Sequence, residues 1–176
     1  MNVLVTGANG FVGRAVIRYL TDHTNHTLSC SVRNTSAAES LKRLGMPVSA
    51  VGEIGSNTDW LPALEGVNCV VHCAARVHVM SADGDDLTLF RQVNRDGTLR
   101  LAEQAVACGV KRFVFISTIK VNGDSTPPGM PFTPHSVPDP KGGYAISKLE
   151  AELELQALAE RTGLELIIIR PPLVYG

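Results

Sequence analysis

Hydrophobic residues along the chain fall into short runs that are separated by longer amphipathic stretches. The short runs are rich in valine, leucine and isoleucine and lie at 3–5, 27–32, 48–51, 69–73, 112–117 and 164–170. Apolar runs of this length are typical of strands that are buried on both faces. In the stretches between them apolar residues recur at helical spacing. This spacing predicts helices over 11–21, 36–44, 58–64, 86–108 and 144–161.

Strands and helices alternate along the whole chain. This order predicts a parallel sheet with helices on both faces, because parallel strands need crossover connections. The 176 residues are enough for one domain of this kind. We therefore predict an α/β fold with a doubly wound parallel sheet, formed by a single domain over 1–176.

The longest segment without a strand or helix pattern is 123–143, which contains six of the ten prolines. Loops of this length in a compact domain are usually functional or mobile. The segment lies between the strand predicted at 112–117 and the helix predicted to begin at Tyr144. We expect it to lie where a ligand binds.

Charge and composition exclude several classes of partner. Sixteen basic residues offset seventeen acidic ones, so no overall field attracts nucleic acid or an anionic membrane. No apolar run reaches the roughly twenty residues of a membrane-spanning helix, and the first residues lack the pattern of a signal peptide. We expect a cytoplasmic protein with no nucleic-acid or membrane partner.

The four cysteines lie in apolar surroundings, at positions 30, 69, 73 and 108. In a chain of this size they predict reduced, buried thiols in a cytosolic protein. Cys69 and Cys73 with His72 and His78 suggest a zinc site as an alternative. Alternation along a strand would send neighbouring side chains to opposite faces, so we predict no metal.

A glycine-rich turn follows the first predicted strand. Its glycines at 7, 10 and 13 allow a tight turn and a close approach of a ligand to the backbone. The helix that follows directs its free N–H groups toward this turn, which favours a pyrophosphate. We predict a dinucleotide site here rather than a structural turn, formed by Gly7, Asn9, Gly10, Phe11, Val12 and Gly13.

The end of the second predicted strand bears on which dinucleotide binds. It carries Arg33 and no acidic residue, which favours the 2′-phosphate of NADP over the ribose hydroxyl of NAD. A solvated arginine is the alternative. Glu53 and Ile54, after the third strand, are candidates for contact with the adenine, and an exposed turn carboxylate is the alternative for Glu53.

Tyr144 and Lys148 are four residues apart at the start of a predicted helix. Their side chains therefore lie on one face, where a phenol and an ammonium share a small space. For an isolated pair, the simpler interpretation is a packed tyrosine beside a solvated lysine.

The glycine-rich TGxxGxxG and the YxxxK at 144–148 together resemble the extended short-chain dehydrogenase/reductase family of nucleotide-sugar epimerases and dehydratases. The resemblance covers essentially the whole chain and implies that the domain over 1–176 is an NAD(P)-binding Rossmann domain. It includes further motifs in the order of the family, at 72–75, 94–98, 115–118 and 170–176.

The resemblance implies roles for individual residues. Tyr144 is the general acid and base, Lys148 lowers its pKa and holds the nicotinamide ribose, and Thr118 orients the substrate alcohol, with Ser117 as the neighbouring alternative. Further cofactor contacts are implied for Cys73, Ala74, Ala75, Asn94 and Pro171. Asn122 stands where the family commonly has a tyrosine, so contacts of that loop with substrate are less defined.

The activity implied is hydride transfer between NAD or NADP and a sugar carbon, C4 of a UDP-linked hexose or N-acetylhexosamine. Dehydration ranks below epimerisation and reduction, because Ile119 and Lys120 stand where dehydratases place an acidic residue. The resemblance also implies a C-terminal substrate domain in a longer enzyme and a homodimer through the helices at 86–108 and 144–161. The alternative function is a dinucleotide-binding module or redox sensor without turnover.

Overall fold

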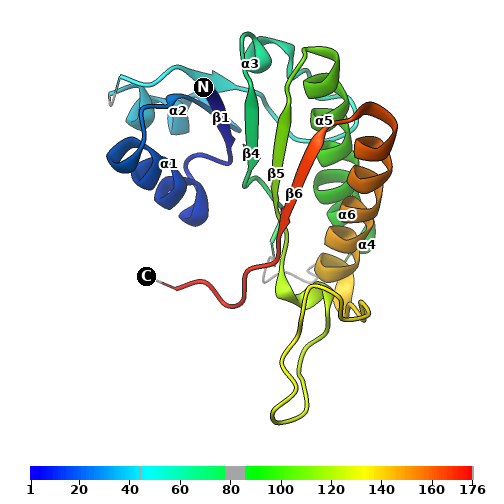
Figure 1. Cartoon of the computed structure of the whole chain (residues 1–176). Helices are drawn as coiled ribbons and strands as arrows, with labels where there is room; N and C mark the ends of the chain where they lie inside the picture. Colours follow the sequence, from blue (N-terminus) through cyan, green and yellow to red (C-terminus); the bar gives the residue numbers. More distant parts are fainter. Residues whose placement is uncertain (44, 78–85, 176) are drawn as a thin grey trace.

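A computed structural model of the chain has a six-stranded parallel sheet with helices on both faces (Figure 1). It describes residues 1–43, 45–77 and 86–175. The strands, in the spatial order β3-β2-β1-β4-β5-β6, are β1 (Asn2–Thr6), β2 (Thr27–Val32), β3 (Val48–Ala50), β4 (Cys69–His72), β5 (Arg112–Ile116) and β6 (Glu165–Ile169). The predicted fold class is confirmed.

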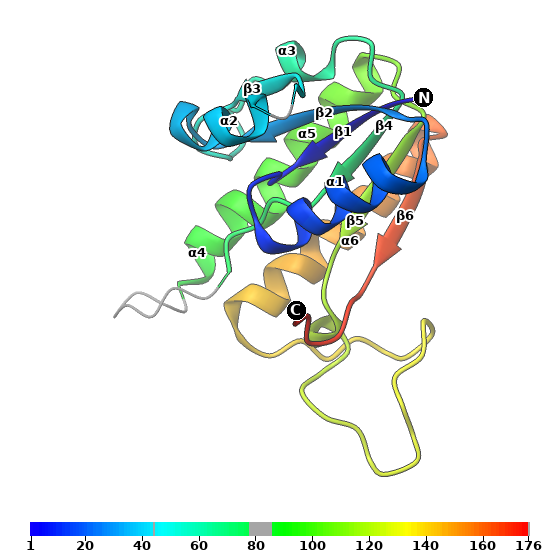
Figure 2. The ribbon, with the colours of Figure 1, turned by 90° about the vertical axis from the view of Figure 1, so that its left-hand side faces the viewer.

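The helices form two layers. They are α1 (Phe11–His23), α2 (Thr35–Lys42), α3 (Leu61–Leu64), α4 (Leu87–Phe90), α5 (Gly97–Ala107) and α6 (Gly142–Thr162), with a π-helix η1 (Arg91–Asp96) and a 3₁₀ turn η2 (Ile119–Val121). Helices α1 and α2 lie on one side of the sheet, and α5 and α6 lie on the other (Figures 1 and 2).

Alternation along the strands builds a core on each face of the sheet. On β1, Val3 and Val5 belong to the core on one face of the sheet, together with Ile17 of α1. Leu4 belongs to the core on the other face, together with Leu101 of α5. All five side chains are at most 5% exposed. Because successive side chains of β1 point to opposite faces of the sheet, the strand contributes residues to the cores under both helix layers.

Strand β6 is covered on one face. Leu166 and Ile168 pack against the core that contains α5 and α6. Ile167 and Ile169 alternate with them along the strand, on the opposite face, and are 39% and 44% exposed. Among the described residues, no helix lies over this face of β6 (Figure 1).

The long helix predicted over 86–108 is present over 87–107, but its middle part is not α-helical. The π-helix Arg91–Asp96 separates α4 from α5. Asn94 lies within it, 1% exposed, and its side chain bonds to the Arg76 backbone and to Ser147 of α6. A one-turn widening of this kind leaves apolar spacing nearly unchanged, so sequence periodicity does not reveal it.

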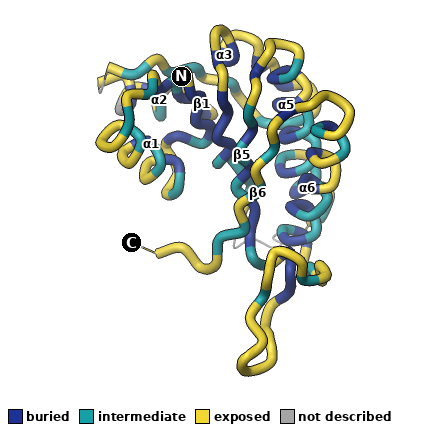
Figure 3. The backbone as a smooth tube through the Cα atoms, viewed as in Figure 1, coloured by how far each residue is buried: buried dark blue, intermediate teal, exposed yellow. Residues whose placement is uncertain are grey.

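The loop at 123–143 projects from the sheet and is largely exposed (Figures 1 and 3). Its Phe132, Thr133 and Pro134 line a separate cavity of about 370 Å³ beside Arg170. They do not line the cavity at the glycine-rich turn described below, so the loop lies apart from the predicted dinucleotide site.

The cysteines differ from the prediction at one position. Cys30 and Cys69 are buried and Cys73 is half-buried, but Cys108 is exposed at the end of α5. Within the described ranges, none of the helices is both long and apolar enough to span a membrane.

Candidate functional site

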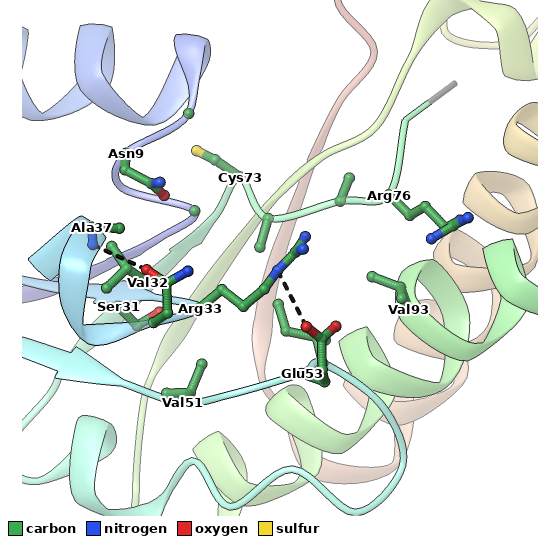
Figure 4. Close-up of a pocket in the computed structure, with 16 residues that line it drawn as sticks. Asn9, Ser31, Val32, Arg33, Ala37, Val51, Glu53, Cys73, Arg76 and Val93 are labelled. Atoms are coloured by element: carbon green, nitrogen blue, oxygen red, sulfur yellow. Dashed lines mark hydrogen bonds and ion pairs between the residues drawn. The ribbon is translucent and has the colours of Figure 1, made fainter. Parts of the chain in front are cut away.

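The strand order reverses between β1 and β4, and a cavity of about 460 Å³ lies beyond the carboxyl ends of these strands and of β2 and β3 (Figure 4). In open α/β sheets ligands bind at such a reversal. Nine of the predicted cofactor residues line this cavity: Gly7, Asn9, Gly10, Arg33, Glu53, Ile54, Cys73, Ala74 and Ala75.

The glycine-rich turn depends on two glycines. Gly7 has a φ of +62°, and a Cβ there would lie 2.7 Å from the Ala74 nitrogen. A Cβ on Gly13 would lie 2.3 Å from the Gly7 carbonyl oxygen. Both distances are shorter than carbon contacts allow, so only glycine lets the turn lie against β4 and against α1.

The first turn of α1 is suited to an anion. Gly10 is its N-cap, and no side chain from the described part of the sequence caps it. The helix begins with N–H groups that need acceptors, and its dipole places partial positive charge beside the cavity. A pyrophosphate supplies both the acceptors and the negative charge.

Arg33 and Glu53 face each other across the mouth of the cavity (Figure 4). Arg33 Nε lies 3.8 Å from Glu53 Oε1, and the side chains are 66% and 80% exposed. An exposed pair of this kind contributes little to stability and can separate when a ligand enters. Glu53 is a candidate for contact with adenine, and in this structure its exposed carboxylate pairs with Arg33.

Sequence reasoning missed seven residues that line the cavity: Ser31, Val32, Asn34, Ala37, Val51, Arg76 and Val93. Several flank predicted contacts at strand ends, and extending each strand-end contact by one or two residues would have included them. Ser31 is 1% exposed, and its hydroxyl has no hydrogen-bond partner among the described residues. A buried polar group left unsatisfied beside a cavity fits the polar ribose of a dinucleotide.

Six predicted cofactor residues do not line the cavity. The side chains of Phe11 and Val12 line an apolar groove on α1 that includes Val174. Gly13 lies behind the turn, and Asn94 bonds to the backbone of Arg76, which does line the cavity. Lys148 and Pro171 lie near the end of β5, where Pro171 accepts a hydrogen bond from the Ile119 nitrogen.

Lys148 is 1% exposed, and its ammonium donates to the Ile116 carbonyl at 2.7 Å and lies 3.9 Å from the centre of the Phe115 ring. Burial lowers the pKa of Lys148 to about 7, and the charge of Glu152 opposes this shift. The ammonium is therefore close to its midpoint at neutral pH. It is held at the strand end that precedes Thr118.

Tyr144 lies in the first turn of α6, half-buried, with its ring 6.1 Å from that of Phe90. Burial raises the pKa of the phenol. The family resemblance implies the opposite direction, with Lys148 and an oxidised nicotinamide lowering that pKa. In this structure Lys148 contacts the Ile116 carbonyl, and desolvation of the phenol dominates.

Ser117 and Thr118 differ in what their hydroxyls do. The Ser117 hydroxyl is 3% exposed and bonds to the Glu152 carboxylate. Thr118 is 9% exposed and accepts a hydrogen bond of 3.3 Å from the Lys120 nitrogen at the start of η2. The Ser117 hydroxyl is thus engaged within the core, which leaves Thr118 as the more accessible of the two.

His72 links the glycine-rich turn to the helix layer beneath it. It is 1% exposed, with Nδ1 at 2.7 Å from the Thr6 hydroxyl and Nε2 at 3.0 Å from the Thr98 hydroxyl. The Thr6 hydroxyl also accepts from the Ala74 nitrogen at 3.3 Å. Burial, aided by the charge of Lys148, lowers the pKa of His72 to about 3. The imidazole is therefore neutral in the folded chain.

The neutral His72 predicts a specific acid sensitivity. The unfolded histidine takes up a proton below about pH 6.5, whereas the folded one does so only near pH 3, so the unfolded state binds more protons between these values. As pH is lowered from about 6.5 to about 3, the free energy of unfolding should therefore fall by up to about 1.4 kcal/mol per pH unit. Denaturant titrations at several pH values should show a flatter dependence for His72→Gln than for the parent. The exposed His135→Gln is the control, and an equal flattening in both variants would contradict the assignment.

The structure describes three of the four residues of the alternative zinc site, Cys69, His72 and Cys73. His78 lies outside the described residues. Within the described ranges, no group of three or more histidine, cysteine, aspartate or glutamate side chains is placed to hold a metal ion.

Comparisons with known proteins agree with this geometry. UDP-glucose 4-epimerase from Vibrio cholerae is 43% identical over 176 residues, which cover 99% of this chain and 52% of that protein. The crystal structure of UDP-glucuronic acid 4-epimerase from Bacillus cereus in complex with NAD superimposes with a TM-score of 0.82 at 24% identity, covering 100% of this chain and 58% of that one. The crystal structure of Thermus thermophilus UDP-glucose 4-epimerase in complex with NAD superimposes with a TM-score of 0.81 at 26% identity. It covers 97% of this chain and 54% of that one.

The chain thus covers 52% of the length of the Vibrio cholerae relative, which is about half. A family model described as the NAD dependent epimerase/dehydratase family matches residues 3–176. The matched residues include the glycine-rich turn and α6, which carries Tyr144. The chain belongs to the NAD dependent epimerase/dehydratase family.

Proposed function

We propose that the chain is the dinucleotide-binding half of an enzyme that transfers a hydride at a carbon of a nucleotide sugar. The observation that carries this proposal is the juxtaposition of Gly7 and Ala74, which leaves no room for a Cβ between the glycine-rich turn and β4. This close approach forms one wall of a cavity with an uncapped helix start and an unsatisfied buried hydroxyl at Ser31. A pyrophosphate and a ribose would satisfy those two features.

The sugar carbon we propose is C4 of a UDP-linked hexose or N-acetylhexosamine. Support comes from the Vibrio cholerae relative, whose name gives UDP-glucose and position 4. We place epimerisation and reduction ahead of dehydration, because Ile119 and Lys120 follow Thr118 where dehydratases carry an acid.

We assign the proton chemistry to Tyr144, Lys148 and Thr118. A bound nicotinamide would supply the hydride acceptor or donor. The Tyr144 phenol would exchange the proton of the substrate hydroxyl, and the Thr118 hydroxyl would hydrogen-bond the same oxygen as charge develops on it. Lys148, positioned by the Ile116 carbonyl and the Phe115 ring, would provide positive charge at the strand end.

The raised pKa of Tyr144 suits the acid half of this exchange. A neutral phenol donates a proton, whereas acceptance of one requires positive charge nearby to favour the phenolate. Because burial lowers the pKa of Lys148 to about 7, its charge increases as pH falls toward neutrality. We therefore propose that the protonation of Lys148 determines how readily Tyr144 acts as a base.

For the cofactor we propose a preference for NADP over NAD, based on Arg33. Its guanidinium lies at the cavity mouth, paired only with an exposed carboxylate at 3.8 Å in the described structure. The Bacillus cereus and Thermus thermophilus structures contain NAD, so this preference would set the chain apart from them.

Arg33→Ala should weaken NADP⁺ binding about 10- to 100-fold, the cost of one charge-assisted contact to a phosphate, and should change NAD⁺ binding little. Calorimetric titration of both nucleotides measures this difference. Arg18→Ala, at an exposed ion pair on α1 with Asp22, is the control. Equal losses for NAD⁺ and NADP⁺ would remove the argument for a 2′-phosphate.

The second candidate function is a dinucleotide-binding module or redox sensor without turnover. The observation in its favour is that the cavity at the glycine-rich turn is lined without Thr118, Tyr144 and Lys148. Turnover of a nucleotide sugar by a protein carrying this chain would exclude it. We also propose a homodimer through α4, α5 and α6, which analytical ultracentrifugation can test.

A further inference from the structure

An ion pair joins Arg170, the residue after β6, to Glu152 in the middle of α6, beside the proposed catalytic residues. Arg170 Nε donates to both oxygens of Glu152, at 3.0 and 3.1 Å. Glu152 is 1% exposed and the Arg170 side chain is 20% exposed. Apolar side chains would join these two elements at least as well, because burying a charged pair costs desolvation. What the pair adds is directed hydrogen bonding and charge.

The pair reaches the strand end that carries Thr118. The Ser117 hydroxyl bonds to the Glu152 carboxylate, and the Ser117 nitrogen donates to the Ile169 carbonyl at 2.7 Å. On the other side of Thr118, the Ile119 nitrogen donates to Pro171 at 2.9 Å. The residues on both sides of Thr118 are thus tied to β6 and its continuation, next to Arg170.

The pair also reaches the long loop. Arg170 Nη1 donates to the Asn122 side-chain oxygen at 3.2 Å, and the Asn122 amide donates to the Ser136 carbonyl at 3.3 Å. Asn122 is 4% exposed. Arg170 therefore connects the middle of α6, the turn after Thr118 and the loop at 123–143.

Glu152 is also the carboxylate nearest in sequence to Lys148 on the buried face of α6. The two residues are four apart, on one helix face, and both are 1% exposed. The charge of Glu152 raises the pKa of Lys148 against the effect of burial. Among the other groups around Lys148, Cys73 acts in the same direction as Glu152, and Lys148 in turn lowers the pKa of His72. Tyr144 lies one turn earlier on α6.

We propose that Glu152 and Arg170 form a positioning pair, in which the carboxylate of Glu152 supports the ammonium of Lys148 and, through Ser117, fixes the strand end that carries Thr118. Neither residue needs to touch substrate for this role. The proposal rests on the proposed function, since it assumes that Lys148 and Thr118 act in catalysis.

The test uses the chain as it is, labelled with ¹³C-lysine, and follows the Lys148 side chain by NMR as pH is varied. The signal is assigned by its loss in Lys148→Arg. In Glu152→Gln the midpoint of Lys148 should fall by about one pH unit, because a nearby negative charge is lost. Glu150→Gln is the matched control, since Glu150 lies on α6 but pairs with Arg91 and Arg95. An unchanged midpoint in Glu152→Gln, or an equal fall in Glu150→Gln, would overturn the proposal.

Amide exchange tests the contact with the strand end. In Glu152→Gln the Ser117 and Ile119 amides should exchange about tenfold faster relative to the amides of β1, whereas a general loss of stability would speed both sets alike. If Glu152→Gln does not fold, the double variant Glu152→Gln/Arg170→Met removes both charges of the pair. Its amide exchange is then compared with that of the parent chain, which keeps Glu152. Neither measurement involves turnover, so both can be interpreted independently of the proposed function. Activity that survived Tyr144→Phe would contradict the proposed function but would not change the result of either measurement.

Discussion

Replacing Tyr144 by phenylalanine should lower nucleotide-sugar turnover about 100- to 10,000-fold in a full-length protein that carries this chain, because a positioned proton donor and acceptor contributes rate of that order. The ring would remain, with its edge contact to Phe90 at 6.1 Å. Only the phenol oxygen is lost. Binding of NAD⁺ or NADP⁺ should therefore change little, since Tyr144 does not line the cavity at the glycine-rich turn.

The measurement is steady-state turnover of a UDP-hexose, paired with calorimetric titration of the cofactor into the same variant. Tyr19→Phe provides the matched control, because it removes a phenol that is exposed on α1. Turnover within a few fold of the parent in Tyr144→Phe would remove Tyr144 from the mechanism. Loss of cofactor binding together with turnover would show that the residue acts by holding the site.

Replacing Gly7 by alanine should abolish dinucleotide binding at ordinary concentrations and destabilise the fold. The residue has a φ of +62°, which strains any side chain, and its Cβ would lie 2.7 Å from the Ala74 nitrogen. The turn must shift, and N–H groups that face the cavity lose their alignment. Loss of two charge-assisted hydrogen bonds would weaken binding by about 100- to 10,000-fold, which moves it beyond ordinary nucleotide concentrations.

The control separates backbone strain from the close approach. Gly109 has a φ of +80°, but a Cβ there would meet no heavy atom of the described residues within 4 Å. Gly109→Ala should lower the free energy of unfolding by about 1 kcal/mol through strain alone. Gly7→Ala should lower it by about 1–3 kcal/mol more, because backbone must also move. Equal stabilities in denaturant titrations, with binding intact in both, would contradict the account.

The sequence predicted the fold and the phosphate end of the site because both depend on local patterns. Apolar runs identify strands that are buried on two faces, and the glycines at 7 and 13 mark a turn whose form follows from missing side chains. The carboxyl ends of parallel strands meet at one edge, which brings Arg33 after β2 and Ala74 after β4 to the same cavity.

The remaining features depend on contacts between distant elements, which spacing along the chain does not encode. Neither the bond from Lys148 to Ile116 nor the ion pair of Arg33 with Glu53 follows from a motif. The π-helix that places Asn94 against Ser147 leaves apolar spacing nearly unchanged. Sequence motifs thus identified residues in the site, whereas the state of Tyr144 and Lys148 required their surroundings.

The most direct test of the central claim is to denature the purified chain and identify any released nucleotide by mass, followed by titration of the emptied and refolded chain with NAD⁺ and NADP⁺. The account predicts that one of the two is released or binds, and that Gly7→Ala prevents it. Tightly held NAD⁺ would point to an epimerase that recycles its hydride and would overturn the preference drawn from Arg33. A folded chain that releases neither nucleotide and binds neither would contradict the claim that this half of the family fold holds the cofactor.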